Sequence, residues 1–233
     1  MAKARPQEVK GVNKSEAIRS VAEDLGSGAR PRDIRAALKE QGIEVSAALM
    51  FAALSSNDNV GLCLFTDRVE KFIRPQKGRK HVHRLLSEML RFSARHKKTD
   101  ISKTLHFLSR VARRRGIIFV VSDCISAGYE KQLRILHMRH DVVIIQLTDD
   151  NEQEFPDVGF ILVEDEESGE QVFVDSGSGK FKDAYLAAKM RSDSEVLRQI
   201  RRSGVDSVQI STSKPFIVPL RRFFSKRVRR FSR

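Results

Sequence analysis

Apolar and polar residues follow one another in blocks that predict a succession of strands and helices. The most distinct block, Ile117 to Val121, holds five β-branched or aromatic residues with no polar residue between them. Such a run is typical of a strand buried on both faces, as in a parallel sheet covered by helices. Similar reasoning predicts strands at 60–65, 69–73, 142–147, 160–164, 171–175 and 205–210, and helices at 77–92, 99–111, 129–140 and 180–202.

The order of these elements defines the expected fold class. A strand, a helix and a strand follow one another between residues 117 and 147, which implies a right-handed crossover and parallel pairing. The chain has 233 residues, of which 40% are hydrophobic, enough for one large domain or for one domain with a small appendage. We therefore expect an α/β fold with a mostly parallel sheet.

The amino-terminal part predicts a separate, all-helical segment. Residues 1–12 predict a disordered tail, and residues 13–48 predict short helices, with Gly42 ending the one that starts at Pro31 and a new helix starting at Ser46. This layout resembles a helix-turn-helix, in which the helix from Ser46 would enter a DNA major groove. The body of that helix, AALMFAAL, is apolar, which suits a protein core better than DNA.

Charge is the second feature that bears on function. The formal net charge is +13, and an excess of this size favours association with polyanions. The most basic stretch is the carboxyl-terminal tail, residues 221–233, which together with Leu220 predicts an amphipathic helix. Such a helix either lies on a membrane or nucleic acid or docks its phenylalanines on the body while its arginines stay in water.

Nothing in the sequence predicts a membrane span or a disulfide framework. No apolar run approaches the roughly 18 residues of a spanning helix, and the first residues lack the apolar centre of a secretion signal. We therefore expect a cytoplasmic protein. Cys63 and Cys124 both fall in or beside predicted strands, where a free thiol behaves as a small hydrophobe.

Asp123 is the first candidate for a functional residue. It directly follows the strand-like run that ends at Val121 and Ser122, and open α/β folds bind ligands at the carboxyl edge of the sheet. An Asp in this position also caps turns. Both interpretations, a site residue and a turn cap, are open from the sequence.

Six motifs in a fixed order resemble the bacterial domain of unknown function 58 family, over about residues 49–220. They are NDNVGLCLFTDRVEKFIRPQKGRKHVHRLL, KKTDISKTL, RRRGIIFVVSD, RHDVVIIQLTD, PDVGFILVEDEESGEQVFVD and GVDSVQISTSKPFIVPLRRFF. The resemblance implies a von Willebrand factor A-like, doubly wound sheet with a divalent-metal site at its carboxyl edge. It also implies a partnership with MoxR-type AAA+ ATPases in the assembly or maturation of protein complexes.

The same resemblance implies that the metal site is incomplete. By order, Thr99 and Asp123 match two of the family's three metal loops, and such oxygen ligands suit Mg²⁺. The first strand and its D-x-S-x-S loop are missing, and Asp100 to Thr104 fits that pattern only loosely and reads as a helix cap. We therefore expect a weak remnant site and no bound cofactor.

The lost strand would lie between the strand at 60–65 and the strand at 117–121, so these two either pair directly or leave an unpaired seam. The expected division is a tail, 1–12, a helical segment, 13–48, a von Willebrand factor A-like domain, 49–220, and a basic tail, 221–233. The expected function is a non-enzymatic protein-interaction module that works with a MoxR-type AAA+ ATPase. The alternative is a nucleic-acid-binding protein that uses the amino-terminal helices and the basic tail.

Overall fold

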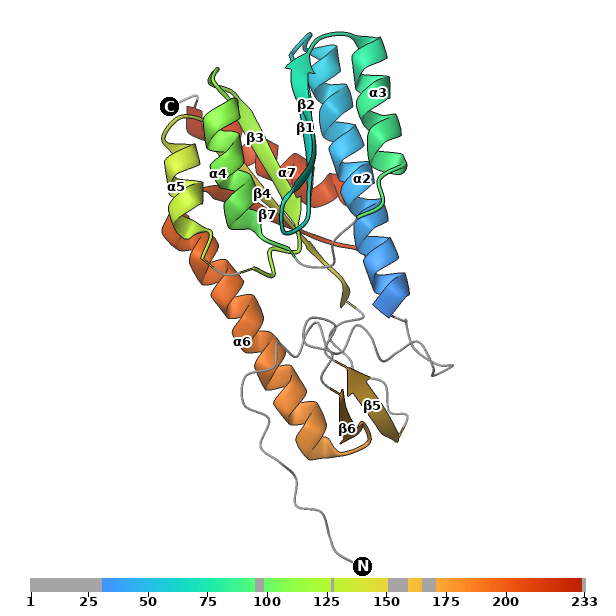
Figure 1. Cartoon of the computed structure of the whole chain (residues 1–233). Helices are drawn as coiled ribbons and strands as arrows, with labels where there is room; N and C mark the ends of the chain where they lie inside the picture. The colour runs from blue at the N-terminus through green and yellow to red at the C-terminus, as the bar shows by residue number, and fades with distance from the viewer. Residues whose placement is uncertain (1–30, 95–98, 127, 151–158, 165–170, 232–233) are drawn as a thin grey trace, which may run out of the picture.

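The structure is a computed structural model that describes residues 31–94, 99–126, 128–150, 159–164 and 171–231. The predicted tail 1–12 and the first predicted helix lie outside these residues. The helices and strands, in chain order (Figure 1), are α2 Pro31–Ser55, β1 Val60–Phe65, β2 Val69–Gln76, α3 Arg79–Leu90, α4 Ile101–Val111, β3 Ile117–Ser122, α5 Glu130–His137, β4 Asp141–Thr148, β5 Phe160–Glu164, β6 Gln171–Asp175, α6 Gly179–Ser203, β7 Asp206–Ser211 and α7 Ile217–Phe231.

The central sheet is parallel and has the order β3-β4-β7, which confirms the predicted α/β class. Ile117 of β3 pairs with Asp141 of β4, and Val143 of β4 pairs with Asp206 of β7. Two antiparallel hairpins, β1-β2 and β5-β6, form separate sheets. The middle strand β4 is buried along its length, because it has a neighbour on each side and helices on both faces.

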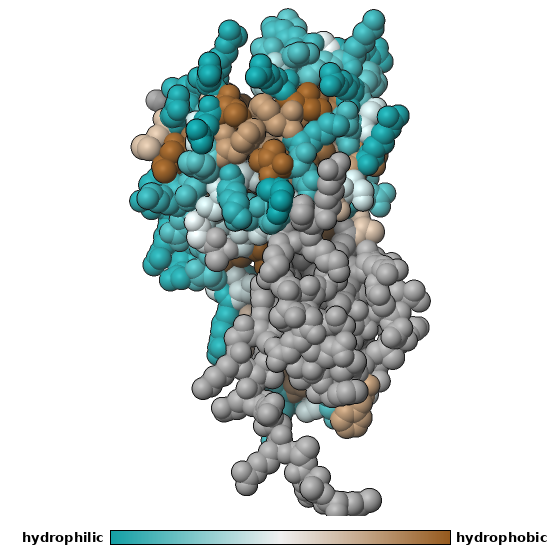
Figure 2. Space-filling view, in the orientation of Figure 1, coloured by the Kyte–Doolittle hydropathy of each residue, from teal (hydrophilic) through white to brown (hydrophobic). Residues whose placement is uncertain are grey.

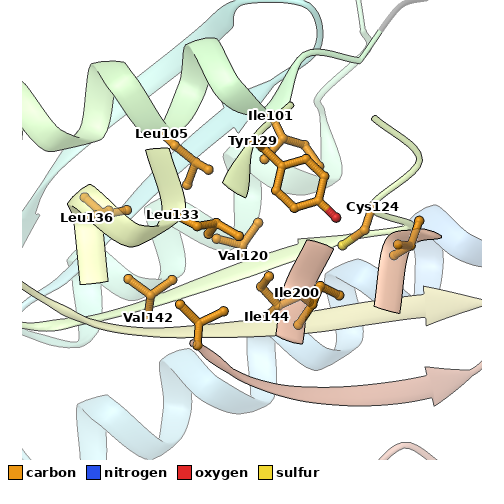
Figure 3. Close-up of a cluster of buried hydrophobic side chains, with 12 residues drawn as sticks. Ile101, Leu105, Val120, Cys124, Tyr129, Leu133, Leu136, Val142, Ile144 and Ile200 are labelled. Carbon is orange, nitrogen blue, oxygen red and sulfur yellow. The ribbon is translucent and has the colours of Figure 1, made fainter. Parts of the chain in front are cut away.

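Side chains of β4 point alternately into two apolar clusters, one on each face of the sheet. Val142 and Ile144 pack with α4, α5 and α6 (Figure 3). Val143 and Ile145 pack with α2, β7 and α7. A continuous apolar run is thus explained by helices on both faces of the strand, as the sequence predicts.

Helix α2 differs from the prediction. The expected break at Gly42 is wrong, because one helix runs from Pro31 to Ser55 and crosses the predicted boundary between residues 48 and 49. Val45 is fully buried against the central sheet, and Met50 packs in the cluster of the β1-β2 hairpin. The helix-turn-helix arrangement is therefore absent from the described residues, and the predicted recognition helix packs on the apolar clusters through Leu49 and Met50.

Gly42 lets α2 approach the sheet. A Cβ atom at this position would lie 3.2 Å from Cδ1 of Leu147 and 3.8 Å from Cγ1 of Val121. The glycine weakens the helix by about 1 kcal/mol relative to alanine, and the close packing of α2 on β4 compensates for that loss.

A Gly42→Leu substitution should lower the free energy of unfolding by about 1–3 kcal/mol, because the larger side chain overpacks the contact with Leu147. Chemical denaturation measures the change. Gly42→Ala is the matched control, since its gain in helix propensity opposes a small clash. A leucine variant as stable as the alanine variant would show that α2 does not pack tightly there.

Helix α7 docks on the sheet, as one of the two predicted alternatives requires. Leu220 is buried, and Phe223 and Phe224 pack against the apolar cluster on that face. The expectation that the arginines stay in water is wrong for Arg227, whose side chain is buried, whereas Val228 of the same helix is 65% exposed.

Arg227 ties α7 to the amino ends of two strands. Its Nη2 atom lies 2.6 Å from both carboxylate oxygens of Asp141, at the start of β4. Its Nε atom lies 3.3 Å from Asp206 Oδ2, at the start of β7. The guanidinium carbon lies 5.5 Å from the centroid of the Phe223 ring. Two carboxylates and an aromatic face therefore compensate for burying this cation.

The sequence predicts that the strands at 60–65 and 117–121 either pair directly or leave an unpaired seam. The structure shows the unpaired seam. Within the described residues, β1 pairs with β2 and β3 pairs with β4, and no hydrogen-bonded ladder joins β1 to β3. Helix α2 contacts both strands, and Phe65, which ends β1, packs against the cluster that contains Val120 of β3. We call the facing edges of β1 and β3 the seam.

Candidate functional site: the carboxyl edge of the sheet

The turns that follow β1, β3, β4 and β7 meet at one edge of the molecule. Parallel strands β3, β4 and β7 end there by definition, and α4 runs antiparallel to β3, so the start of α4 lies at the same edge. The backbone N–H of Asp100, which caps α4, donates to the Thr66 carbonyl at 3.0 Å, which brings the β1-β2 turn to this edge too (Figure 1). We call residues 66–68, 99–100, 123–126, 149–150 and 211–214 the carboxyl-edge loops.

Asp123 serves as a turn cap at this edge. Its Oδ1 atom accepts hydrogen bonds from the Ser122 hydroxyl at 3.2 Å and from the Ile125 N–H at 3.3 Å. The Ser122 hydroxyl oxygen in turn accepts from the Cys124 N–H at 3.1 Å. A side chain that bonds the N–H two residues on is a common device of Asp in turns, so the structural interpretation of Asp123 is confirmed.

This turn directs Cys124 into the core. Cys124 has a φ of 61°, in the left-handed region that non-glycine residues seldom adopt. Its side chain is 1% exposed, and the hydroxyl of Tyr129 points toward its sulfur (Figure 3). Burial, followed by the charge of Asp123, raises the pKa of the Cys124 thiol. The thiolate, which is the nucleophilic form, is therefore disfavoured here.

Cys63 in β1 is likewise a free thiol. Burial raises its pKa to about 12. Neither cysteine is thus prepared for nucleophilic chemistry at neutral pH, and both behave as the small hydrophobes that the sequence predicts.

The loops after β4 and β7 form a second polar group, which the sequence reasoning missed. The Ser213 hydroxyl donates to the Asp150 carboxylate, and the Ser211 and Ser213 hydroxyl oxygens lie 2.8 Å apart. Hydrogen bonds from Ser213, and then from Ser211, hold the pKa of Asp150 below its usual value. The sequence does contain a signal for this second polar group, because Asp149 and Asp150 follow the buried strand β4 just as Asp123 follows β3.

Gln41 connects α2 to this second group. Its Nε2 atom donates to the Ser211 carbonyl at 2.9 Å, and its side chain is 8% exposed. The helix that carries Gln41 therefore helps to fix the loop after β7.

The two predicted metal ligands, Thr99 and Asp123, both lie in the carboxyl-edge loops. Thr99 lies exposed ahead of Asp100, whose carboxylate accepts from the Lys103 N–H at 3.0 Å and so caps α4, as predicted. Within the described residues, no group of three or more His, Cys, Asp or Glu side chains is placed to hold a metal ion. Mg²⁺ demands near-octahedral oxygen ligands. One carboxylate that already caps its own turn and one exposed threonine do not meet that demand. A shared metal at Thr99 and Asp123 stays a prediction.

We expect millimolar Mg²⁺ to leave the melting temperature unchanged. A metal that binds the native state stabilises it by RT ln(1 + [L]/Kd), and the ligand set is too poor for binding in this range. Thermal unfolding with and without Mg²⁺ measures this, with Asp123→Ala as the control variant. A clear rise that this variant abolishes would show that the remnant site binds metal.

Comparison with known proteins places the chain in a family. Residues 16–195 match the family described as "Protein of unknown function DUF58", and the chain belongs to it. Because the match begins at residue 16, the amino-terminal helical segment, which the sequence reasoning separated from the family, lies largely within it.

The curated relatives that the chain matches are uncharacterized mycobacterial proteins. An uncharacterized protein of Mycobacterium bovis and one of Mycobacterium tuberculosis are each 24% identical over 196 residues, covering 82% of this chain and 61% of the relative. An uncharacterized protein of Mycobacterium avium is 27% identical over 133 residues, covering 56% of this chain and 77% of the relative. The chain therefore spans 61% of the length of the first two relatives.

One solved structure resembles the chain at low similarity. It is the crystal structure of the conserved hypothetical protein BatB from Bacteroides thetaiotaomicron, with a TM-score of 0.47 and 10% sequence identity. The alignment covers 92% of this chain and 95% of that protein.

No described helix of this chain has the length and apolar content needed to cross a membrane.

Proposed function

We propose that the chain is a non-enzymatic protein-interaction module of von Willebrand factor A type whose carboxyl-edge loops bind a partner protein. The observation that carries this proposal is the gathering of loops from four strands at one edge. Local hydrogen bonds hold their carboxylates, in particular Asp123 in its own turn and Asp150 against the loop after β7. Rigidly held groups lose little entropy on binding, which favours recognition.

The chemistry of the edge supports binding over catalysis. The thiol beside Asp123 is buried with a raised pKa, and the carboxylates are distributed over separate turns. An arrangement of this kind offers charge complementarity to a basic surface, which governs specificity and association rate. The resemblance of the ordered motifs further suggests that the partner is a MoxR-type AAA+ ATPase, acting in protein complex assembly or maturation.

Purified chain and a MoxR-type ATPase from the same genome should bind, and an Asp123→Asn, Asp150→Asn double variant should bind about tenfold more weakly, because two charges at the interface are lost. Asparagine retains the side-chain oxygen that caps the turn, so the melting temperature should not change. Isothermal titration calorimetry measures the affinity. The matched control is Asp58→Asn, an exposed aspartate in the turn before β1. Undetectable binding by the unaltered chain, or equal affinity of the double variant and the control, would refute the proposal.

A further inference from the structure

Strand β3 presents a backbone edge that no strand of the described residues covers. It pairs with β4 from Ile117 to Ser122, and the other side of β3 has no ladder partner there. Edge strands in native proteins are usually protected by lysine, proline, inward-pointing charge or a bulge. The sequence of β3, IIFVVS, contains no charged residue and no proline. The sequence of β3 therefore has none of the lysine, proline or charged residues that usually prevent an edge strand from pairing with another strand.

The side chains of β1 and β3, the strands on the two sides of the seam, are less buried than those of an apolar strand usually are. Every side chain from Val142 to Leu147 in β4 is buried, whereas in β3 only Val120 is, and Ile117 is 59% exposed. None of the side chains of β1, VGLCLF, is fully buried. In Figure 2 apolar side chains gather between hydrophilic ones over the β1-β2 hairpin, β3 and α4. Both strands have one neighbour fewer than a fully covered apolar strand requires.

The two edges of the seam are held in a fixed relation. Helix α2 contacts both β1 and β3 on one face. On the other face α4 packs on the hairpin through an edge-to-face contact of Phe107 with Phe72, 5.3 Å between ring centroids, and its Leu105 packs in the cluster that holds Val120. Because β1 and β3 both end at the carboxyl edge, they run parallel. A strand between them would join the hairpin and the central sheet into one sheet.

We propose that the seam accepts one extended segment of a second polypeptide, which adds a parallel strand between β1 and β3. The segment must match β1 and β3, which are each 6 residues long, and must be apolar on both faces, since α2 and α4 cover both. Its amino end would lie beside Arg113, Arg114 and Arg115, all exposed, and therefore carries acidic residues. Its carboxyl end approaches Asp123 and carries a basic residue.

Two other occupants fit less well. Residues 1–30 contain no apolar run comparable to β1 or β3. The β3 strand of a second copy is itself covered by helices α2 and α4, so it cannot enter between β1 and β3 without leaving its own core. Pairing of this kind provides main-chain hydrogen bonds for affinity and side-chain contacts for specificity.

The probe is a synthetic peptide, acetyl-EDVIVIVTNK-amide. It should bind the full chain, raise its melting temperature, and slow amide hydrogen exchange in residues 60–65 and 117–122. A peptide with proline at the central position, acetyl-EDVIPIVTNK-amide, should not bind, because proline cannot donate to the ladder. The reversed-flank peptide, acetyl-KNVIVIVTDE-amide, should bind more weakly, because its charges repel those of the seam.

A matched pair of protein variants locates the binding. Ile117→Lys places a charge on the β3 edge at an exposed position and should weaken peptide binding about tenfold without changing the melting temperature. Met138→Lys, at a residue that is 75% exposed after α5, should bind as the unaltered chain does. The Asp150→Asn variant should also bind normally, so failure at the carboxyl-edge loops is distinguishable from failure at the seam.

Several outcomes would overturn the inference. Slow amide exchange on both edges in the free monomer would show that the chain fills its own seam. Slow exchange in a dimer that Ile117→Lys dissociates would show that a second copy fills it. Absence of peptide binding at millimolar concentration, equal binding of the proline peptide, or equal loss in the Ile117→Lys and Met138→Lys variants would each refute it.

Discussion

An Arg227→Met substitution should lower the free energy of unfolding by about 2–4 kcal/mol. Removing one member of a buried charge cluster leaves the remaining charges without compensation, which is worth about 3–5 kcal/mol when the site is fully dry. Asp141 and Asp206 are about a third exposed, so water offsets part of the loss. Methionine preserves much of the apolar stem, and the change therefore reports mainly the ionic contacts.

Chemical denaturation of matched variants tests this expectation. Arg222→Met changes an exposed arginine of the same helix and should alter stability by no more than about 0.5 kcal/mol. In a double-mutant cycle, Asp141→Asn should cost much less in the Arg227→Met background than alone, because the two residues share one interaction. If Arg227→Met and Arg222→Met are equally stable, α7 is not fixed by this cluster.

The strands could be predicted because the local sequence of each strand alone indicates that it is buried. An uninterrupted apolar run such as IIFVV or VVII has no polar face, so only a strand covered on both faces satisfies it. The order of the elements then implies parallel pairing. The cap at Asp100 was likewise predictable, because an acidic residue before an apolar helical pattern satisfies the first N–H groups of the helix.

Gly42 could not be assigned from its neighbours. A glycine at the end of a short amphipathic pattern usually marks a helix terminus, and nothing local separates that case from a glycine that faces another element. What decides the case is the contact with Leu147, a residue that is far away in sequence. The same limit applies to Arg227, whose partners begin two different strands.

The candidate site was likewise predictable in part from the sequence. Position predicted that Asp123 lies at the carboxyl edge, but whether its carboxylate caps a turn or faces a ligand depends on backbone geometry at Cys124, which local composition does not specify. Asp150 and its serine partners were missed because Ser211 and Ser213 follow a different strand. Only the parallel register of β4 and β7 brings these residues together.

A Val45→Asp substitution should unfold the chain or remove most of its stability. Val45 is fully buried between α2 and the central sheet, and an unpaired buried carboxylate costs several kcal/mol. Domains are stable by only about 5–15 kcal/mol, so the penalty is comparable with the total. Circular dichroism and the amide exchange of β4 measure the outcome.

The amide exchange of β4 in the Val45→Asp variant shows whether the amino-terminal part folds as an independent unit or as part of the sheet domain. If residues 13–48 formed an independent helical unit, Val45→Asp would unfold only that unit and leave β4 protected. Because α2 covers one face of β4, we expect protection to be lost across the whole sheet. The control, Ala52→Asp, places the same charge at an exposed position of the same helix and should cost no more than about 1 kcal/mol, the loss of helix propensity. Retained protection in β4 of the Val45→Asp variant would show that the sheet folds without α2.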